Sequence, residues 1–243
     1  MMRVFYDLDA LSLGAAEFFV QQAEAAMKSR GRFVLALAGG HTPGRTYELL
    51  AQPPFRSQVD WARVHIFWGD ERCVPLDDLR SNARMAQDAL LNHVPVPFSQ
   101  IHPMMCRESP GKDAQRYEAL LRGFFSGSAP CFDLVLLGLG TNGHTASLFP
   151  HTAVLTEQER WVSELYDSEQ NLYRITLTSR IINQAAAVVF LVAGADKAGV
   201  LQAVLQGPQD PMRLPAQFIR PVGSGELHWF VDQAAASWHD SAS

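Results

Sequence analysis

Short apolar runs alternate with segments of helical periodicity along almost the whole chain. The apolar runs are rich in β-branched and aromatic residues, which favour strands that are buried on both faces of a sheet. Seven such runs predict strands at residues 33–38, 64–68, 132–137, 161–166, 173–178, 187–192 and 227–231. This alternation is typical of a mostly parallel sheet that lies between two layers of helices.

Amphipathic segments predict helices between most of these strands, at residues 10–29, 42–51, 81–92, 112–125 and 196–205. Thr42 precedes Pro43, so we expect Thr42 to be an N-cap with proline at the first helical position. Ser81 and Asp196 are predicted to cap their helices in a similar way. A helix of about two turns is expected before Pro150, because proline cannot continue a helix.

These elements predict an α/β fold with three layers, α/β/α, and one domain over residues 1–243. The proline-rich connections at 94–97 and 207–211 are typical of loops within a domain, because periodic segments resume directly after them. We expect a sheet of this size to carry a small subdomain in the 161–178 region.

Composition and charge exclude several classes of protein. Of the 243 residues, 47% are hydrophobic and 19% charged, which is unlike a disordered chain, collagen or a coiled coil. A net charge of −5 predicts no nucleic-acid and no membrane partner, since both usually require a basic face. The longest apolar stretch, 185–195, is far shorter than the roughly 20 residues of a spanning helix. Asp7 and Asp9 stand where a signal peptide would be basic and then apolar, so we expect a cytoplasmic protein.

The chain has three cysteines, Cys73, Cys106 and Cys131, at wide spacing and without a Cys-x-x-Cys pair. An odd number in this arrangement predicts neither a disulfide framework nor a zinc knuckle, and we expect reduced thiols that pack as small hydrophobic side chains. No His-Glu-x-x-His motif or cluster of acids and histidines is present, so no metal site is expected.

The first candidate site is a strand that runs into glycines and then a helix, at residues 37–43. Gly39 and Gly40 allow the backbone to approach a ligand closely, and the free N–H groups near His41 and Thr42 favour an anion such as phosphate. The alternative is a plain strand-to-helix turn, which is common in α/β proteins.

The second candidate site, at residues 67–75, places two acids and an arginine directly after a strand. Ligands of open parallel sheets bind at this edge, and the planar guanidinium of Arg72 suits phosphate oxygens. The alternative is that Asp70 or Glu71 pairs with Arg72 or caps a turn.

The third candidate site contains Gly138, Gly140 and Gly143, which match the dinucleotide pattern G-x-G-x-x-G. Two features argue against a dinucleotide. Pro150 ends the next helix too early for a crossover, and His144 follows the last glycine directly. A glycine turn at the end of a strand would present the His144 imidazole to a pocket at a near-neutral pKa, so we expect it to act as a general base. The alternative is a helix-capping or packing histidine.

The three motifs together resemble the 6-phosphogluconolactonase family. The strings Ala-Gly-Gly-His-Thr-Pro at 38–43, Trp-Gly-Asp-Glu-Arg-Cys-Val-Pro at 68–75 and the segment 138–150 occur in the family's order. Further similar pieces are Ser81-Asn82, 174–178, Ile182-Asn183, Lys197-Ala198 and 214–217. The resemblance spans nearly the whole chain.

The resemblance implies a modified Rossmann-like sheet, shared with glucosamine-6-phosphate deaminase and ribose-5-phosphate isomerase, that binds no dinucleotide. It implies hydrolysis of 6-phosphoglucono-δ-lactone to 6-phosphogluconate in the pentose phosphate pathway, without metal or cofactor. The expected partner is thus a small sugar-phosphate lactone, and we expect a monomer.

Lactone hydrolysis by a protein of this family gives the candidate site residues expected roles. His144 is the expected base for water, and backbone N–H groups of the Gly138–Gly143 turn are expected to stabilise the oxyanion. Gly140, Asn142 and Gly143 of this turn are expected to contact the substrate. Arg72 and Lys197, with the Gly39–Thr42 loop, are expected to hold the phosphate. Asp70 is expected to bond sugar hydroxyls or to orient Arg72.

Two positions depart from the family's pattern, which commonly has serine where His41 stands and aspartate where Asn142 stands. Asn142 keeps the tolerance for a left-handed turn but lacks a charge beside His144. His41 removes a small hydroxyl from the phosphate loop and leaves the backbone N–H contacts in place.

Three other functions remain as alternatives. A sugar-phosphate deaminase or isomerase would use the same fold. A non-catalytic sugar-phosphate sensor usually carries a DNA-binding module, and about one helix before the first glycine loop leaves no room for a helix-turn-helix. A dinucleotide-dependent dehydrogenase fits least.

Overall fold

A six-stranded parallel sheet forms the centre of the computed structural model, which describes residues 1–126 and 132–238. Its strand order is β1-β9-β8-β5-β2-β3. The bounds are β1 Met2–Phe5, β2 Phe33–Leu37, β3 Val64–Trp68, β5 Leu134–Leu137, β8 Ala187–Val192 and β9 Glu226–Asp232. Every residue of β2, β5 and β8 is buried, as expected for strands that are covered on both faces.

A smaller antiparallel sheet, of order β4-β7-β6, lies beside the carboxyl end of β3. Its strands are β4 Asp70–Arg72, β6 Val162–Asp167 and β7 Leu172–Leu177. The β6–β7 hairpin confirms the predicted small subdomain in the 161–178 region. Only Gly69 separates β3 from β4, so the small sheet begins where the central sheet ends.

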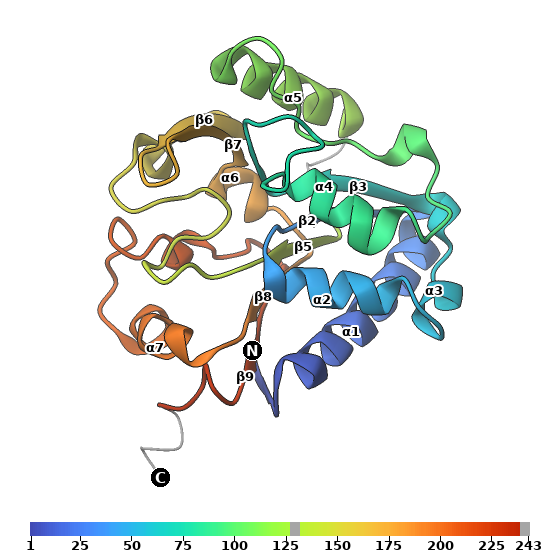
Figure 1. Cartoon of the computed structure of the whole chain (residues 1–243), viewed down its shortest axis with the longest axis horizontal. Coiled ribbons are helices and arrows are strands. Elements are labelled where there is room, and N and C mark those ends of the chain that lie inside the picture. Colours follow the sequence, from blue (N-terminus) through green and yellow to red (C-terminus); the bar gives the residue numbers. More distant parts are fainter. Residues whose placement is uncertain (127–131, 239–243) are drawn as a thin grey trace.

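Helices flank the sheets (Figure 1). The helices are α1 Leu8–Arg30, α2 His41–Leu50, α3 Phe55–Gln58, α4 Asn82–Ala86, α5 Pro110–Phe124, α6 Ser179–Ile182 and α7 Ala198–Gln206. Helix α1 packs on α2 and β9, and α5 packs on the small sheet. Short 3-10 turns are η1 Trp61–Arg63, η3 Phe98–Gln100, η4 Ala153–Thr156, η5 Ala195–Lys197 and η6 Pro215–Phe218, and α4 continues as a π-helical turn, η2 Gln87–Leu91. In the described part of the chain, no helix is both long and apolar enough to cross a membrane.

The predicted capping residues are confirmed in one case of three. Ser81 caps α4, and its Oγ accepts the N–H of Arg84 at 3.1 Å. Thr42 is not a cap, because Gly40 at φ 102° turns the chain directly into α2, which begins at His41. Asp196 lies inside η5 and caps no helix. No side chain therefore caps the N–H groups at the start of α2.

The predicted helix before Pro150 is wrong. Residues 145–150 form a turn in which Ala146 has a φ of 47°. Ser147 directs its N–H to Thr176 Oγ1 at 3.2 Å and its Oγ to Asp70 Oδ2 at 2.5 Å. These bonds to the small sheet replace the bonds of a helix.

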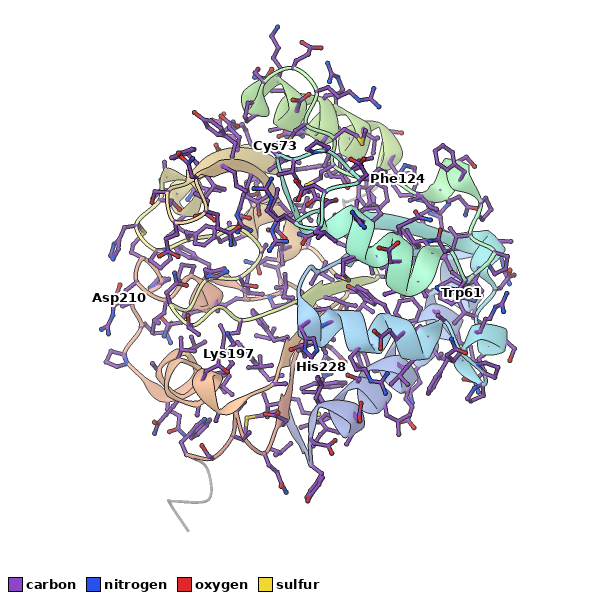
Figure 2. All side chains as sticks on the ribbon, viewed as in Figure 1. Trp61, Cys73, Phe124, Lys197, Asp210 and His228 are labelled. Atoms are coloured by element: carbon purple, nitrogen blue, oxygen red, sulfur yellow. A yellow bond between two sulfur atoms is a disulfide. The ribbon has the colours of Figure 1, made fainter. Side chains whose placement is uncertain are left out.

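The expectation of reduced cysteines is wrong for two of the three, because Cys73 and Cys106 form a disulfide. Cys73, which is labelled in Figure 2, follows β4. Cys106 lies shortly before α5, which packs on the small sheet. A separation of 33 residues gave no local signal for this pairing. Cys131 lies outside the described residues.

The disulfide is expected to stabilise the fold, because it closes a loop of 33 residues that would otherwise be free in the unfolded chain. Replacement Cys106→Ser should lower the free energy of unfolding by about 3 kcal/mol. Urea unfolding of the oxidised protein, the reduced protein and the variant measures this. Reductant should destabilise the wild type and leave the variant unchanged. Equal midpoints for oxidised and reduced wild type would contradict the prediction.

Candidate active site

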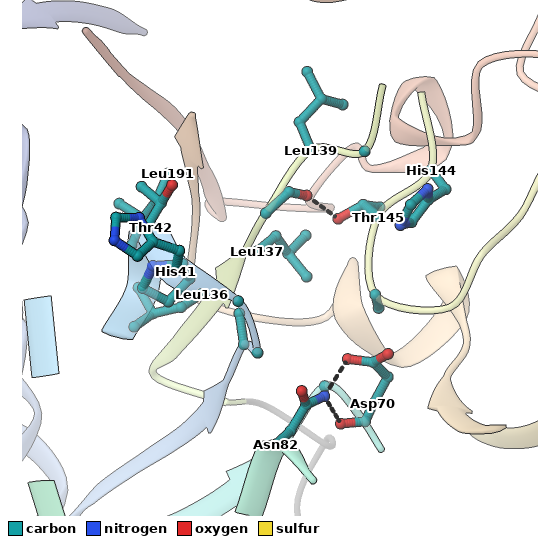
Figure 3. A pocket seen from close by; sticks show the side chains of 18 of the residues that line it. His41, Thr42, Asp70, Asn82, Leu136, Leu137, Leu139, His144, Thr145 and Leu191 are labelled. Carbon is teal, nitrogen blue, oxygen red and sulfur yellow. Dashed lines mark hydrogen bonds between the residues drawn. The ribbon is translucent and has the colours of Figure 1, made fainter. Parts of the chain in front are cut away.

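A cavity of about 500 Å³ lies where the carboxyl ends of β2, β3, β5 and β8 meet. All three glycine-bearing or charged motifs of the sequence reach it, as Figure 3 shows for His41, Asp70 and His144. The sequence-predicted residues that line it are Gly39, Gly40, His41, Thr42, Asp70, Arg72, Gly140, His144 and Lys197. Asn142 and Gly143 are not among the lining residues.

One side of the cavity is formed by the turn from β2 into α2. Its N–H groups have no side-chain cap, which leaves a helix N-terminus open to an anion. Gly39 is required here, because a Cβ at this position would lie 1.9 Å from Oδ1 of Asn82. His41 and Thr42 also line the cavity, at the first turn of α2.

Arg72, the last residue of β4, supplies a cation next to this turn. Its Nη1 donates to the carbonyl of Arg80 at 2.8 Å and to Oδ1 of Asn82 at 2.7 Å. Its Nε is buried and has no hydrogen-bond partner among the residues that the structure describes. The guanidinium is therefore not fully satisfied by the protein, and Arg72 is one of the residues that line the cavity.

Glu71 is buried and has a structural role. Its carboxylate accepts the N–H groups of Arg72, Asn82 and Ala83 at 2.7–2.8 Å and the hydroxyl of Ser81 at 3.0 Å. Burial raises the pKa of this carboxyl, and the four hydrogen bonds oppose that shift. The turn-capping alternative therefore holds for Glu71, which fixes the start of α4 against β4.

Asp70 is held from several sides. The Nδ2 of Asn82 donates to its carbonyl at 2.9 Å and to its Oδ1 at 3.2 Å (Figure 3). The hydroxyl of Ser147 donates to Oδ2 at 2.5 Å. Since Asn82 also accepts from Arg72, Asp70 is linked to Arg72 through this amide rather than by a direct ion pair.

His144 lies at the end of the glycine turn that follows β5. The N–H of Gly140 donates to the His144 carbonyl at 2.8 Å, and the N–H of Gly143 donates to the Gly140 carbonyl at 2.9 Å. A Cβ on Gly140 would lie 2.1 Å from the His144 ring. The expectation that N–H groups of the Gly138–Gly143 turn stabilise an oxyanion therefore does not hold for Gly140 and Gly143, because the turn itself uses both.

Asn142 orients the His144 imidazole. Its Oδ1 accepts the backbone N–H of His144 at 3.1 Å and lies 2.6 Å from ring Nδ1. An amide oxygen is only an acceptor, so Nδ1 carries the proton and Nε2 holds a free lone pair. Phe149 stacks on the ring, with centroids 4.4 Å apart.

The expected near-neutral pKa of His144 is wrong. Burial is the main reason that its pKa falls to about 4. Arg174 and Lys197 also lower it, while Asp70 and Asp167 oppose the shift. The imidazole is thus neutral at pH 7, which is the form that accepts a proton.

Lys197 lines the cavity from η5, after β8, and its Nζ lies 3.2 Å from Asp196. Arg72, Lys197 and the start of α2 give this cavity positive groups in a chain of net charge −5. The cavity thus combines a neutral imidazole with groups that favour a bound anion.

The β6–β7 hairpin contributes residues to which sequence reasoning gave no role. Asp167, Glu169, Gln170 and Arg174 line the cavity, as does Asn82 from α4. Arg174 and Asn82 appeared only within the family-like strings. Within residues 1–126 and 132–238, no group of three or more His, Cys, Asp or Glu is placed to hold a metal ion.

Comparisons with known proteins agree with this geometry. Residues 6–229 match the family described as Glucosamine-6-phosphate isomerases/6-phosphogluconolactonase. A 6-phosphogluconolactonase of Synechocystis sp. is 46% identical over 86% of each chain, and one of Nostoc sp. is 38% identical over 97% of each. The structure of 6-phosphogluconolactonase from Trypanosoma brucei matches with a TM-score of 0.85 at 29% identity, covering 98% of this chain and 97% of that one. The chain therefore belongs to the family of glucosamine-6-phosphate isomerases and 6-phosphogluconolactonases.

Proposed function

We propose that the protein hydrolyses 6-phospho-D-glucono-1,5-lactone to 6-phospho-D-gluconate, the lactonase step of the oxidative pentose phosphate pathway. The observation that carries the proposal is a neutral imidazole, with Nε2 free, in the same cavity as an uncapped helix N-terminus and Arg72. The names of the relatives from Synechocystis and Nostoc support the choice of lactonase over deaminase.

The phosphate is proposed to lie between Arg72, Lys197 and the Gly39–Thr42 turn. The Arg72 guanidinium and the uncapped N–H groups of α2 supply donors, and Lys197 supplies a second charge. This arrangement holds the substrate by its non-reacting end and leaves the lactone carbonyl for His144.

The reaction proceeds by general-base catalysis. His144 Nε2 removes a proton from water as the water oxygen bonds to the lactone carbonyl carbon. The bond from that carbon to the ring oxygen then breaks, and the imidazolium returns the proton to the ring oxygen. Gly138 and Leu139, the other turn residues that line the cavity, are proposed to face the oxyanion with their N–H groups.

The test of the proposed function is the loss of freshly generated 6-phosphogluconolactone above its spontaneous hydrolysis. Acceleration by the purified protein is expected, together with no release of ammonia from glucosamine 6-phosphate. Ammonia release without lactone hydrolysis would favour the deaminase alternative. Binding of the lactone without turnover would favour the sensor alternative.

Asn142→Asp is expected to keep or raise activity. A carboxylate 2.6 Å from Nδ1 would raise the pKa of His144 and make the imidazole a stronger base. The measurement is kcat/KM against pH, with Asn92→Asp on the exposed end of η2 as the control. A loss of activity with Asn142→Asp alone would contradict the expectation.

We further propose that the enzyme acts as a monomer in the cytoplasm. One chain supplies all the groups that the proposed chemistry uses. Sedimentation in solution and fractionation of cells test the two statements.

A further inference from the structure

A buried ion network lies beside the His144 turn. The Arg174 side chain, on β7, is 5% exposed and lies between Asp70 and Asp167, which are 9% and 5% exposed. Its Nε and Nη2 each lie 2.9 Å from Asp167 Oδ2, and its Nη1 lies 3.4 Å from Asp70 Oδ2. All three nitrogens of the guanidinium thus face carboxylates of the protein.

Arg174 reaches the turn that carries His144 by two routes. Its guanidinium carbon lies 5.2 Å from the ring centroid of Phe149, and Phe149 stacks on His144. On the other side, Asp70 binds both Arg174 and the hydroxyl of Ser147 in the same turn. The guanidinium is therefore the common partner of two of the contacts that hold the turn against the small sheet, beside the Ser147 N–H bond to Thr176 Oγ1.

The charges around His144 come from four elements. Asp70 belongs to β4, Asp167 to β6, Arg174 to β7 and Lys197 to η5. Arg72, Glu169 and Asp196 also line the cavity. Asp70, Asp167 and Arg174 together carry a net charge of −1, and removal of the guanidinium would leave two buried carboxylates facing the imidazole. Those carboxylates would raise the pH at which the imidazole becomes protonated and so move the acid limb of the pH profile. The loss of the contacts to Asp70 and Phe149 would displace the turn and lower kcat.

We propose that Arg174 is a positioning residue of the hydrolysis. It holds Asp70 and Phe149 against the His144 turn and balances the two carboxylates that face the imidazole. This inference rests on the proposed function. It assigns to Arg174 a role apart from the phosphate, since its donors are directed to Asp70 and Asp167.

The experiment compares Arg174→Gln with Arg174→Lys, which keeps the charge. Arg160→Gln is the matched control, because Arg160 also bridges two acids, Glu157 and Glu164, beside the small sheet, but does not line the cavity. Folding is checked by circular dichroism. The readouts are kcat, KM and the acid limb of kcat/KM against pH.

Arg174→Gln is expected to lower kcat at least tenfold, with little change in KM, and to move the acid limb upward by about one pH unit. Arg174→Lys should return the acid limb to the wild-type position and restore part of kcat. Arg160→Gln should match the wild type. An acid limb and kcat that match those of Arg160→Gln would overturn the proposal, as would a loss confined to phosphorylated lactones.

A second variant covers the case in which Arg174→Gln does not fold. This double variant, Arg174→Gln with Asp167→Asn, removes one carboxylate together with the guanidinium. Asp70 then remains as the charged member of the network, so the net charge of the network stays at −1. The double variant should show a low kcat and an acid limb near that of the wild type, whereas a wild-type kcat would overturn the proposal. NMR titration of the His144 ring in the wild type, in Arg174→Gln and in the double variant measures the pH at which the imidazole is protonated, without the need for turnover. A wild type that fails to hydrolyse the lactone would reject the proposed function, and the titration would still decide on Arg174.

Discussion

Replacing His144 by alanine should lower kcat for 6-phosphogluconolactone by about 10²- to 10⁴-fold and leave KM almost unchanged. The imidazole is neutral and is the proposed base, so its loss would leave the attacking water without a proton acceptor. The groups that are proposed to bind the phosphate lie at the other end of the substrate, so binding should persist. The measurement is steady-state hydrolysis with the spontaneous rate subtracted.

The control for this variant is His93→Ala. His93 is exposed, its ring contacts the carbonyl of Asp88, and it does not line the cavity. It should hydrolyse the lactone at the wild-type rate. Near-normal turnover by His144→Ala would remove the imidazole from the reaction and leave the electrostatics of the cavity as the source of catalysis.

The central sheet could be predicted from the sequence because its strands are apolar on both faces. Strands β3 and β8 coincide with the predicted runs at 64–68 and 187–192. Strands β1 and β4 were missed for a physical reason. Arg3 and Val4 of β1 are exposed at the edge of the sheet, and β4 is the polar tripeptide Asp70–Arg72, buried by its pairing with β7. Neither has an apolar run for a pattern to detect.

The site was predicted as far as it depends on the ends of neighbouring parallel strands. The motifs after β2, β3 and β5 meet in one cavity because parallel strands bring their carboxyl ends to one edge. Arg174 received no role, because it reaches the cavity through an antiparallel pairing with Arg72 whose register a sequence does not specify. The pKa of His144 depends on burial and on four charges from separate elements, which local spacing does not reveal.

Arg72→Ala is expected to lower kcat/KM for the phosphorylated lactone by about 10²-fold or more, because a charge-assisted contact to the phosphate is lost. Hydrolysis of unphosphorylated gluconolactone should hardly change. Arg72→Lys should fall between the wild type and alanine, since lysine keeps the charge but lacks the planar guanidinium that binds phosphate oxygens in pairs. The measurement is kcat/KM for both lactones with each variant.

The comparison of two lactones separates phosphate binding from damage to the site. Arg72 also donates to Asn82, which holds Asp70, so alanine at this position disturbs groups beyond the phosphate. Such a disturbance would slow both substrates equally, whereas loss of a phosphate contact affects only the phosphorylated one. Arg80→Ala is the control, because its exposed guanidinium pairs with Asp78 outside the cavity. Equal losses on both lactones would therefore assign Arg72 to the support of Asp70 and leave the phosphate to Lys197 and the start of α2.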